Sequence, residues 1–294
     1  MIDIIHTWTN DNLRLMGIHF IPTSPDTCVL IVHGMSGSII EDYYAEVLGK
    51  LLATKGVGCI YGHNRGFGHI NDIVKRIPGS LGTTTERFGG TYERFIDSKL
   101  DINAWINSCK QLGYKKIILL GHSLGCNKVL YFLSKNSSPL ITGVVLASPP
   151  DAIGLLEKPG LQPNHMELLE EAKRNIRAGN PRKLVSGLIW DWNSLSSQTY
   201  SDLYEKGGAI DNFPLMRNPD IFPELAKITV PILLVMGEND DVVIKSIEED
   251  MELIQSKATG TNAFTMKIIN DADHVYTDHE DKFAQIVTDW VESI

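Results

Sequence analysis

A serine between two glycines is the feature of this sequence best suited to carry out chemistry. Residues 121–125 are Gly-His-Ser-Leu-Gly, with Ser123 at the centre. A serine hydroxyl is a poor nucleophile at neutral pH. It therefore needs a nearby base, a group that orients the base, and donors for the oxyanion that develops on the attacked carbonyl. The glycines leave room for a sharp turn that presents the serine. Ser123 is therefore the candidate nucleophile.

An acid and an imidazole follow Ser123 in the order that such a nucleophile requires. Residues 237–243 are Gly-Glu-Asn-Asp-Asp-Val-Val and contain the adjacent acids Asp240 and Asp241. Residues 271–274 are Asp-Ala-Asp-His and end at His274. Both blocks follow predicted strands, and catalytic groups gather at the carboxyl edge of open α/β sheets. The order predicts His274 as the base and leaves either aspartate open as the acid.

Short apolar runs alternate with amphipathic stretches in the elements that must position these residues. Predicted strands cover residues 2–8, 13–20, 29–32, 57–61, 117–120, 141–147, 230–236 and 264–269, and predicted helices cover 42–55, 92–112, 126–133 and 279–293. This rhythm is typical of a mainly parallel sheet flanked by helices, here with an antiparallel hairpin at its edge. The stretch 66–91 is rich in glycine and threonine and has little periodicity, which predicts a long loop.

The alternation stops between residues 151 and 225. This segment has helical signals, such as 166–177, and a concentration of aromatic side chains that includes Trp190 and Trp192. We interpret 1–150 and 226–294 as one core domain and 151–225 as a helical lid inserted into it. The two tryptophans are candidates to line a substrate pocket, although packing the insertion onto the core is the simpler role for them.

Composition excludes several classes of partner. The chain has 294 residues, 43% of them hydrophobic, and a formal net charge of -9. An acidic surface repels phosphate backbones and anionic membranes, so we expect neither nucleic acid nor membrane as a partner. The first residues have no signal-peptide pattern, and the four cysteines have no paired spacing, which together predict a cytoplasmic protein with reduced thiols. No ligand spacing surrounds His33 or His63, so we expect no metal.

These motifs together resemble the α/β-hydrolase superfamily, and over most of the chain its small bacterial and fungal esterase-like or lipase-like members. The matching residues are His33-Gly34, Asn64-Arg65-Gly66, the 121–125 motif, the 237–240 block and His274. The resemblance implies an α/β-hydrolase fold that needs no cofactor. The family's acid usually stands three residues after the glycine of its block, which selects Asp240. For Arg65, a structural ion pair is a simpler role than contact with an anionic substrate.

The resemblance also implies an oxyanion hole and an activity. The backbone N–H groups of Met35 and Leu124 would stabilise the tetrahedral oxyanion. The expected reaction is hydrolysis, through an acyl-enzyme on Ser123, of an ester or thioester of a small or medium-sized, largely uncharged acyl compound. A serine at the elbow argues against dehalogenases and epoxide hydrolases, which use aspartate there. An acyltransferase or peptidase would use the same triad, and a non-catalytic receptor for small molecules could retain it. The oligomeric state is open.

Overall fold

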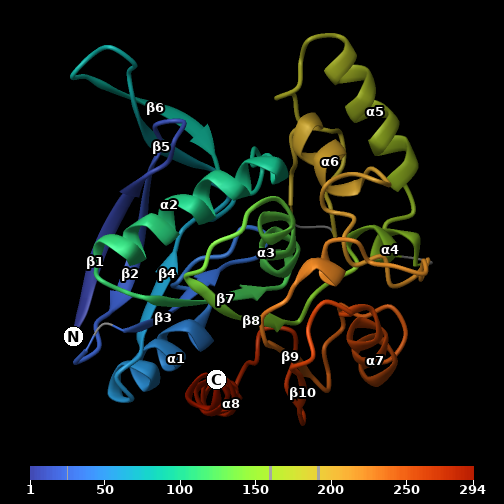
Figure 1. Ribbon diagram of the computed structural model, residues 1–294. Helices are drawn as coiled ribbons and strands as arrows, with labels where there is room; N and C mark the ends of the chain where they lie inside the picture. The colour runs from blue at the N-terminus through green and yellow to red at the C-terminus, as the bar shows by residue number, and fades with distance from the viewer. Residues whose placement is uncertain (25, 159–160, 191–192) are drawn as a thin grey trace.

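A computed structural model describes residues 1–24, 26–158, 161–190 and 193–294, and an eight-stranded sheet forms its centre (Figure 1). The strands lie in the order β1 (Ile2–Trp8), β2 (Arg14–Phe20), β4 (Gly58–Gly62), β3 (Thr27–Val32), β7 (Lys116–His122), β8 (Ile141–Ala147), β9 (Ile232–Gly237) and β10 (Phe264–Ile269). Pairing is antiparallel from β1 through β2 to β4 and parallel from β4 to β10. The predicted mainly parallel sheet with an edge hairpin is confirmed.

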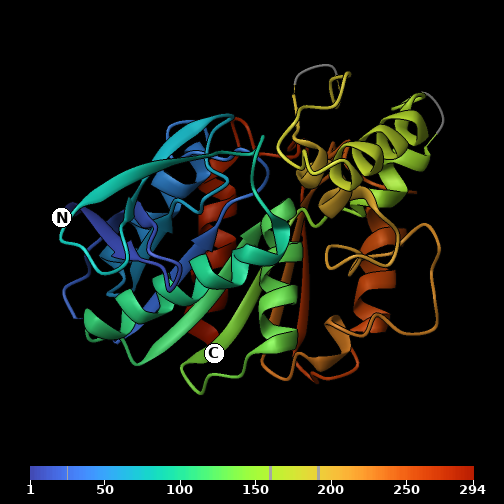
Figure 2. The ribbon, with the colours of Figure 1, turned by 90° about the horizontal axis from the view of Figure 1, so that it is seen from above.

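The central strands are apolar along nearly their whole length because both faces of the sheet are covered. Every residue of β9 is buried, and β3, β7 and β8 each have one residue that is not. Helices α1 (Tyr43–Thr54) and α8 (Glu280–Ser293) cover one face (Figure 2). Helices α2 (Ser98–Gln111), α3 (Leu124–Lys135) and α7 (Ile247–Lys257) pack in the cluster on the other. The sequence prediction did not include α7.

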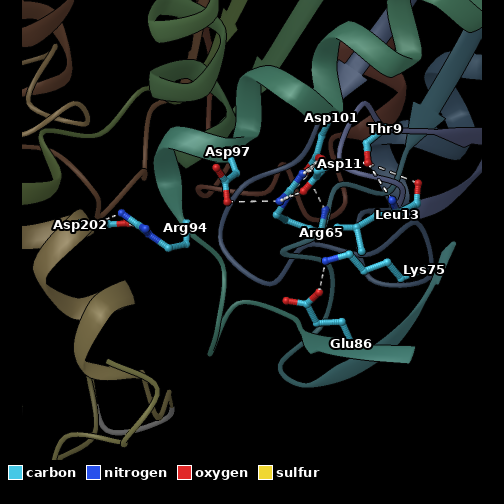
Figure 3. Close-up of polar contacts among 10 residues, drawn as sticks. All are labelled: Thr9, Asp11, Leu13, Arg65, Lys75, Glu86, Arg94, Asp97, Asp101 and Asp202. Atoms are coloured by element: carbon cyan, nitrogen blue, oxygen red, sulfur yellow. Dashed lines mark hydrogen bonds and ion pairs between the residues drawn. The ribbon is translucent and has the colours of Figure 1, made fainter. Parts of the chain in front are cut away.

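The stretch predicted as a long loop contains a second, two-stranded sheet. Strands β5 (Asn71–Arg76) and β6 (Thr83–Phe88) pair antiparallel, and Figure 1 shows this hairpin on the opposite side of the molecule from α5. The loop prediction for 66–91 was wrong because only Ile73 and Phe88 of these strands are buried, which leaves almost no alternation in the sequence. An ion pair between Lys75 and Glu86, with 2.6 Å between Nζ and Oε2, bridges the two strands (Figure 3).

The segment between β8 and β9 contains α4 (Ala152–Glu157), α5 (His165–Arg177), α6 (Ser197–Tyr204) and the short 3-10 turn η2 (Leu225–Lys227). Its apolar residues up to Ile210 form a cluster of their own, which also includes Phe95 and Leu124 of the sheet portion. Phe213 and Phe222 instead join the main cluster beneath the sheet. By packing, the separately organised part of this segment therefore ends before residue 213.

Polar contacts attach α6 to the loop that precedes α2. Asp202 accepts a hydrogen bond from Arg94, with 2.8 Å between Nε and Oδ2 (Figure 3). The carbonyl of Thr91 accepts bonds from the backbone N–H of Ser196 and from the hydroxyl of Thr199. This loop belongs to the sheet portion, so the contacts position the inserted helices relative to the carboxyl edge of the sheet.

Arg65 lies in the loop after β4 and is 1% exposed. Its guanidinium bonds to Asp101 of α2, to Asp11 in the β1–β2 turn and to Asp97 of the 3-10 turn η1 (Phe95–Asp97), while its backbone N–H donates to Asp101 (Figure 3). Asp101 is completely buried and contributes the closest contact, at 2.8 Å. Arg65 therefore has the structural role: it connects its own loop to two parts of the chain that are distant in sequence, the β1–β2 turn and the η1–α2 region.

Removal of Arg65 should destabilise the protein strongly. Arg65→Met leaves the buried carboxylate of Asp101 without its partner, and breaking such a pair costs about 3–5 kcal/mol. The free energy of unfolding from urea titration measures this loss. The double variant Arg65→Met/Asp101→Asn should recover part of it, because no unpaired charge then remains buried. Arg87→Gln, which breaks an exposed ion pair with Asp72, is the control and should have little effect. Equal losses for both single variants would contradict the structural role.

Candidate active site

Ser123 lies at a sharp turn between β7 and α3, in a backbone conformation that is rare for any residue with a side chain. Its φ is 53° and its ψ is -129°. The turn packs tightly on both sides. A Cβ atom at Gly125 would lie 2.0 Å from the carbonyl oxygen of Val32, and one at Gly121 would lie 2.6 Å from the backbone nitrogen of Cys126. Only glycine fits at these two positions, which explains the spacing of the motif.

His274 and Asp240 meet where the loops that follow β9 and β10 come together. Nδ1 of His274 lies 2.9 Å from Oδ1 of Asp240, which also accepts a hydrogen bond from the backbone N–H of Val242 at 2.9 Å. Asp240 is buried, whereas its neighbour Asp241 is exposed. The geometry therefore favours Asp240 over Asp241 as the acid that orients His274.

Backbone contacts hold these two loops together. The N–H of Glu238 donates to the carbonyl of Ile269, and the N–H of Asn239 donates to that of Ala272. In return, the carboxylate of Glu238 accepts a bond from the N–H of Asp271 at 2.9 Å. The relative position of Asp240 and His274 is thus set by contacts between the loops at the ends of two paired strands.

The pKa of Asp240 reflects opposing effects. Burial raises it, but the hydrogen bond and charge of His274, followed by the Ser148 hydroxyl and the Val242 N–H, outweigh burial and leave the pKa below its ordinary value. The group is therefore a carboxylate at neutral pH. As a carboxylate it accepts a hydrogen bond from the Nδ1–H of His274, so that Nε2 has no proton, as a general base requires.

His122, inside the glycine–serine motif, links the nucleophile turn to the His274 loop. Burial lowers the pKa of His122 to about 4, with a smaller contribution from the charge of His274. The ring is therefore neutral at pH 7, and its Nε2 lies 2.9 Å from the carbonyl oxygen of His274, which only a protonated nitrogen can contact favourably. The local packing role expected for His122 thus includes the positioning of His274.

His33 determines the orientation of the loop after β3. Its Nε2 accepts a hydrogen bond from the backbone N–H of Asn64, so Nδ1 carries the proton and donates to the carbonyl of Gly34, each at 2.9 Å. In a trans peptide the carbonyl and the N–H point in opposite directions, so this bond turns the N–H of Met35 away from the His33 ring. A Cβ atom at Gly34 would lie 3.0 Å from Cβ of Ser123, so this loop lies directly against the nucleophile turn.

Leu124 provides a second backbone N–H beside Ser123. It is the first residue of α3, so its N–H has no acceptor within the helix. Leu124 and Met35 both line the cavity that contains Ser123 and His274. The side chain of Met35 is held in turn by the inserted segment, since Nδ2 of Asn193 lies 3.2 Å from its sulfur atom.

The cavity has a volume of about 430 Å³, which suits a small or medium-sized ligand. Its apolar wall consists mainly of residues from the inserted segment, namely Ala152, Leu155, Leu161, Trp190, Leu203, Tyr204 and Ile210. Trp190 thus lines the cavity, as a residue that contacts substrate would have to. Trp192 lies outside the described residues. Sequence reasoning missed the other members because apolar residues on short amphipathic helices have the same pattern whether they face a cavity or a core.

Asp42 is the cavity residue that sequence analysis missed most completely. It stands directly before α1. It lines the cavity together with His274 and with Gly34 and Gly37 of the loop after β3. In sequence, an aspartate at a helix start indicates a cap, so nothing marked it as part of a site.

No group of three or more histidine, cysteine, aspartate or glutamate side chains in the described residues is arranged to hold a metal ion. Within the same residues, no helix combines the length and apolar character that crossing a bilayer requires.

With the fold and this geometry established, comparison with known proteins identifies the family. The family model described as serine aminopeptidase, S33, matches residues 23–281. The chain belongs to this family of α/β-hydrolases.

Two curated relatives of this S33 hydrolase also hydrolyse their substrates. This chain is 25% identical over 207 residues to a 2-hydroxy-6-oxononadienedioate/2-hydroxy-6-oxononatrienedioate hydrolase of Klebsiella pneumoniae. The match covers 66% of this chain and 69% of the relative. This chain is also 26% identical over 186 residues to phospholipase YtpA of Bacillus subtilis. That match covers 60% of this chain and 67% of the relative.

Solved structures of esterases share the fold. Est1E from Butyrivibrio proteoclasticus superposes with a TM-score of 0.62 at 15% identity, covering 99% of this chain and 98% of that one. The Pyrococcus furiosus esterase Pf2001 superposes with a TM-score of 0.59 at 19% identity. That match covers 100% of this chain and 92% of the esterase chain. The predicted α/β-hydrolase fold is therefore confirmed.

The strain at Ser123 can be measured. A non-glycine residue in such a conformation costs about 1–3 kcal/mol. After the greater entropy of unfolded glycine is subtracted, Ser123→Gly should have a free energy of unfolding about 1 kcal/mol higher than Ser123→Ala and should unfold at a higher temperature. Thermal denaturation of the two purified variants gives the difference. The control pair substitutes Ser134 of α3, which has ordinary helical geometry, and there glycine should be the less stable variant. A less stable Ser123→Gly would show that the turn is not strained.

Proposed function

We propose that this protein hydrolyses an ester or thioester of a small or medium-sized, largely uncharged acyl compound through an acyl-enzyme on Ser123. His274 takes the proton of the Ser123 hydroxyl as that oxygen attacks the carbonyl, and later delivers it to the leaving group. Asp240 holds the tautomer of His274 and stabilises its charged form. Water then attacks the acyl-enzyme by the same steps, which releases the acid and restores Ser123.

The hydrogen bond between Asp240 and His274, at the wall of the cavity that also contains Ser123, is the observation that carries this proposal. We assign the backbone N–H groups of Met35 and Leu124 the role of stabilising the oxyanion. The bond from His33 to Gly34 supports the first assignment, and the start of α3 at Leu124 supports the second. Loss of one oxyanion donor typically raises the barrier by about 3–4 kcal/mol.

The charge of the cavity wall supports an uncharged acyl compound. No lysine or arginine occurs among the described residues that line it, whereas two aspartates, Asp42 and Asp241, do. A dianionic substrate, such as the dienedioate in the name of the Klebsiella relative, would have two carboxylates to bind and no cation to pair with them. The wall thus favours neutral compounds over dioates.

The inserted segment 151–225 is assigned the role of a lid that selects the acyl group. Its helices α4 and α6 each contribute two residues to the apolar wall, and Trp190 packs against Tyr204 with ring centroids 6.2 Å apart. An acyl chain placed against this wall would bury apolar surface, which favours binding by about 25 cal/mol per Å².

Labelling of Ser123 and ester turnover together test the proposal. The wild-type protein should react rapidly with a fluorophosphonate probe and hydrolyse p-nitrophenyl esters, with a dependence on acyl length. Ser123→Ala should lose labelling and at least about 10⁴-fold in kcat while remaining folded, because alanine fits the same turn. Intact mass spectrometry locates the label. Labelling without turnover would favour a receptor, and turnover of amino-acid p-nitroanilides instead of esters would favour a peptidase.

The assignment of the acid gives a sharper comparison between neighbouring residues. Asp240→Asn keeps the shape of the side chain but removes the carboxylate that fixes His274, so kcat/KM for a p-nitrophenyl ester should fall by about 10³–10⁴-fold. Asp241→Asn removes the same charge from an exposed position and should reduce kcat/KM by less than about tenfold. Steady-state kinetics of both variants measure the ranking, and the reverse ranking would assign the acid to Asp241.

A further inference from the structure

We propose that Asp42 binds the alcohol portion of the substrate, so that the preferred esters carry a hydrogen-bond donor, a hydroxyl or an ammonium, close to the ester oxygen. This inference rests on the proposed function, because it assigns a specificity residue within the same cavity. It adds a polar recognition element to a wall that is otherwise mainly apolar.

The orientation of Asp42 is unusual for its position in the fold. It stands at the N-cap position of α1, where an aspartate ordinarily accepts a hydrogen bond from a backbone N–H of the first turn, but its side chain makes no such bond. Asp151 and Ser196, at the corresponding positions of α4 and α6, do cap their helices. Asp42 thus forgoes the stabilisation that a cap would give and lines the cavity instead.

One oxygen of the Asp42 carboxylate is held by the protein, and the other is available to a ligand. The hydroxyl of Tyr61, at the end of β4, donates to Oδ2. Among the described residues no donor bonds to Oδ1. Asp42 is 8% exposed and therefore 92% buried. Each hydrogen-bond donor stabilises a carboxylate that has been removed from water. A hydroxyl or ammonium group in the cavity would supply that donor.

The fold places Asp42 and the apolar wall on different sides of the nucleophile. Helix α1 packs on the face of the sheet that it shares with α8, whereas the cluster of α4 and α6 adjoins α3, on the other face (Figure 1). An acyl chain against α4 and α6 therefore leaves the alcohol portion on the side of Asp42. This arrangement matches an apolar acyl group joined to a polar alcohol.

The charge of Asp42 changes within an accessible pH range. Burial is the main cause that raises the pKa of Asp42 to about 6, and the charge of Glu41 also raises this pKa. The hydrogen bond from Tyr61 and the charge of His274 act in the opposite direction. Tyr44 of α1 and His33, in the loop after β3, are further titratable groups near it. The carboxylate, which accepts hydrogen bonds more strongly than the protonated acid, therefore predominates above about pH 6.

Three butanoate esters with alcohol portions of similar size test the proposal. They are n-propyl butanoate, 2-hydroxyethyl butanoate and 2-(dimethylamino)ethyl butanoate, whose tertiary amine is protonated but cannot take up the acyl group. At pH 8 the wild-type protein should show a kcat/KM at least about tenfold higher for one or both donor esters than for the propyl ester. Which of the two is preferred distinguishes a hydroxyl from an ammonium donor.

Asp42→Asn should reduce this preference about tenfold while hydrolysis of the propyl ester continues. Glu41→Gln, which removes the same charge from the adjacent exposed residue, is the matched control and should keep the preference. The wild-type ratio of donor ester to propyl ester should also fall as the pH is lowered through about 6. Any effect of pH on the shared acyl-transfer steps is common to both esters and cancels in the ratio, and this measurement does not require a variant to fold.

The outcomes separate this inference from the proposed function. Hydrolysis of all three esters with equal kcat/KM, in the wild type and in Asp42→Asn, would overturn the role of Asp42 and leave the esterase proposal intact. A preference that is independent of pH and survives Asp42→Asn would also overturn it. Failure of the wild type to hydrolyse any ester or to react with the fluorophosphonate would instead remove the proposed function, and this inference with it.

Discussion

The strained turn at Ser123 is the constraint around which the rest of the site is arranged. A serine with φ of 53° persists only where the surrounding structure compensates its cost. Here the compensation comes from the backbone bond between Ser123 and Ala147 of β8, and from the close packing of Gly125 on β3. The turn therefore depends on three neighbouring parallel strands, and it presents Ser123 at their carboxyl edge.

Other strained residues surround the same edge. Ser148, Asp271 and Tyr276 also have positive φ, and they lie in the loops that follow β8 and β10. Their conformations are supported by specific contacts: the hydroxyls of Ser148 and Tyr276 lie 3.0 Å apart, and Tyr276 also donates to the carbonyl of Val235. Such strain clusters at functional sites. In this protein the strained residues lie in the loops after β8 and β10, next to the Asp240–His274 pair, which His122 joins to the nucleophile turn.

Much of this arrangement could be predicted from local sequence because it depends on local patterns. The apolar runs of β3, β7, β8 and β9 are continuous since both faces of the sheet are covered, and a sequence window detects that directly. The β5–β6 hairpin could not be detected in this way. Its stability depends on pairing with residues such as Leu13, which bridges to Lys75, and on charges across the strands, neither of which produces a periodic pattern.

By itself, the sequence determined the kind of fold and the candidates for the chemistry: the nucleophile Ser123, the imidazole of His274 and a pair of adjacent acids. These follow from the order of strands and from motifs whose glycines are sterically required. The family resemblance favoured Asp240, but only the tertiary structure gave the physical reason, since Asp240 is buried against His274 while Asp241 is exposed. Likewise, only the tertiary structure placed Asp42 at the cavity wall, without a capping bond to its own helix. The reason is physical: adjacent aspartates have the same intrinsic chemistry, and burial and hydrogen-bond partners, which come from segments distant in sequence, decide what each of them does.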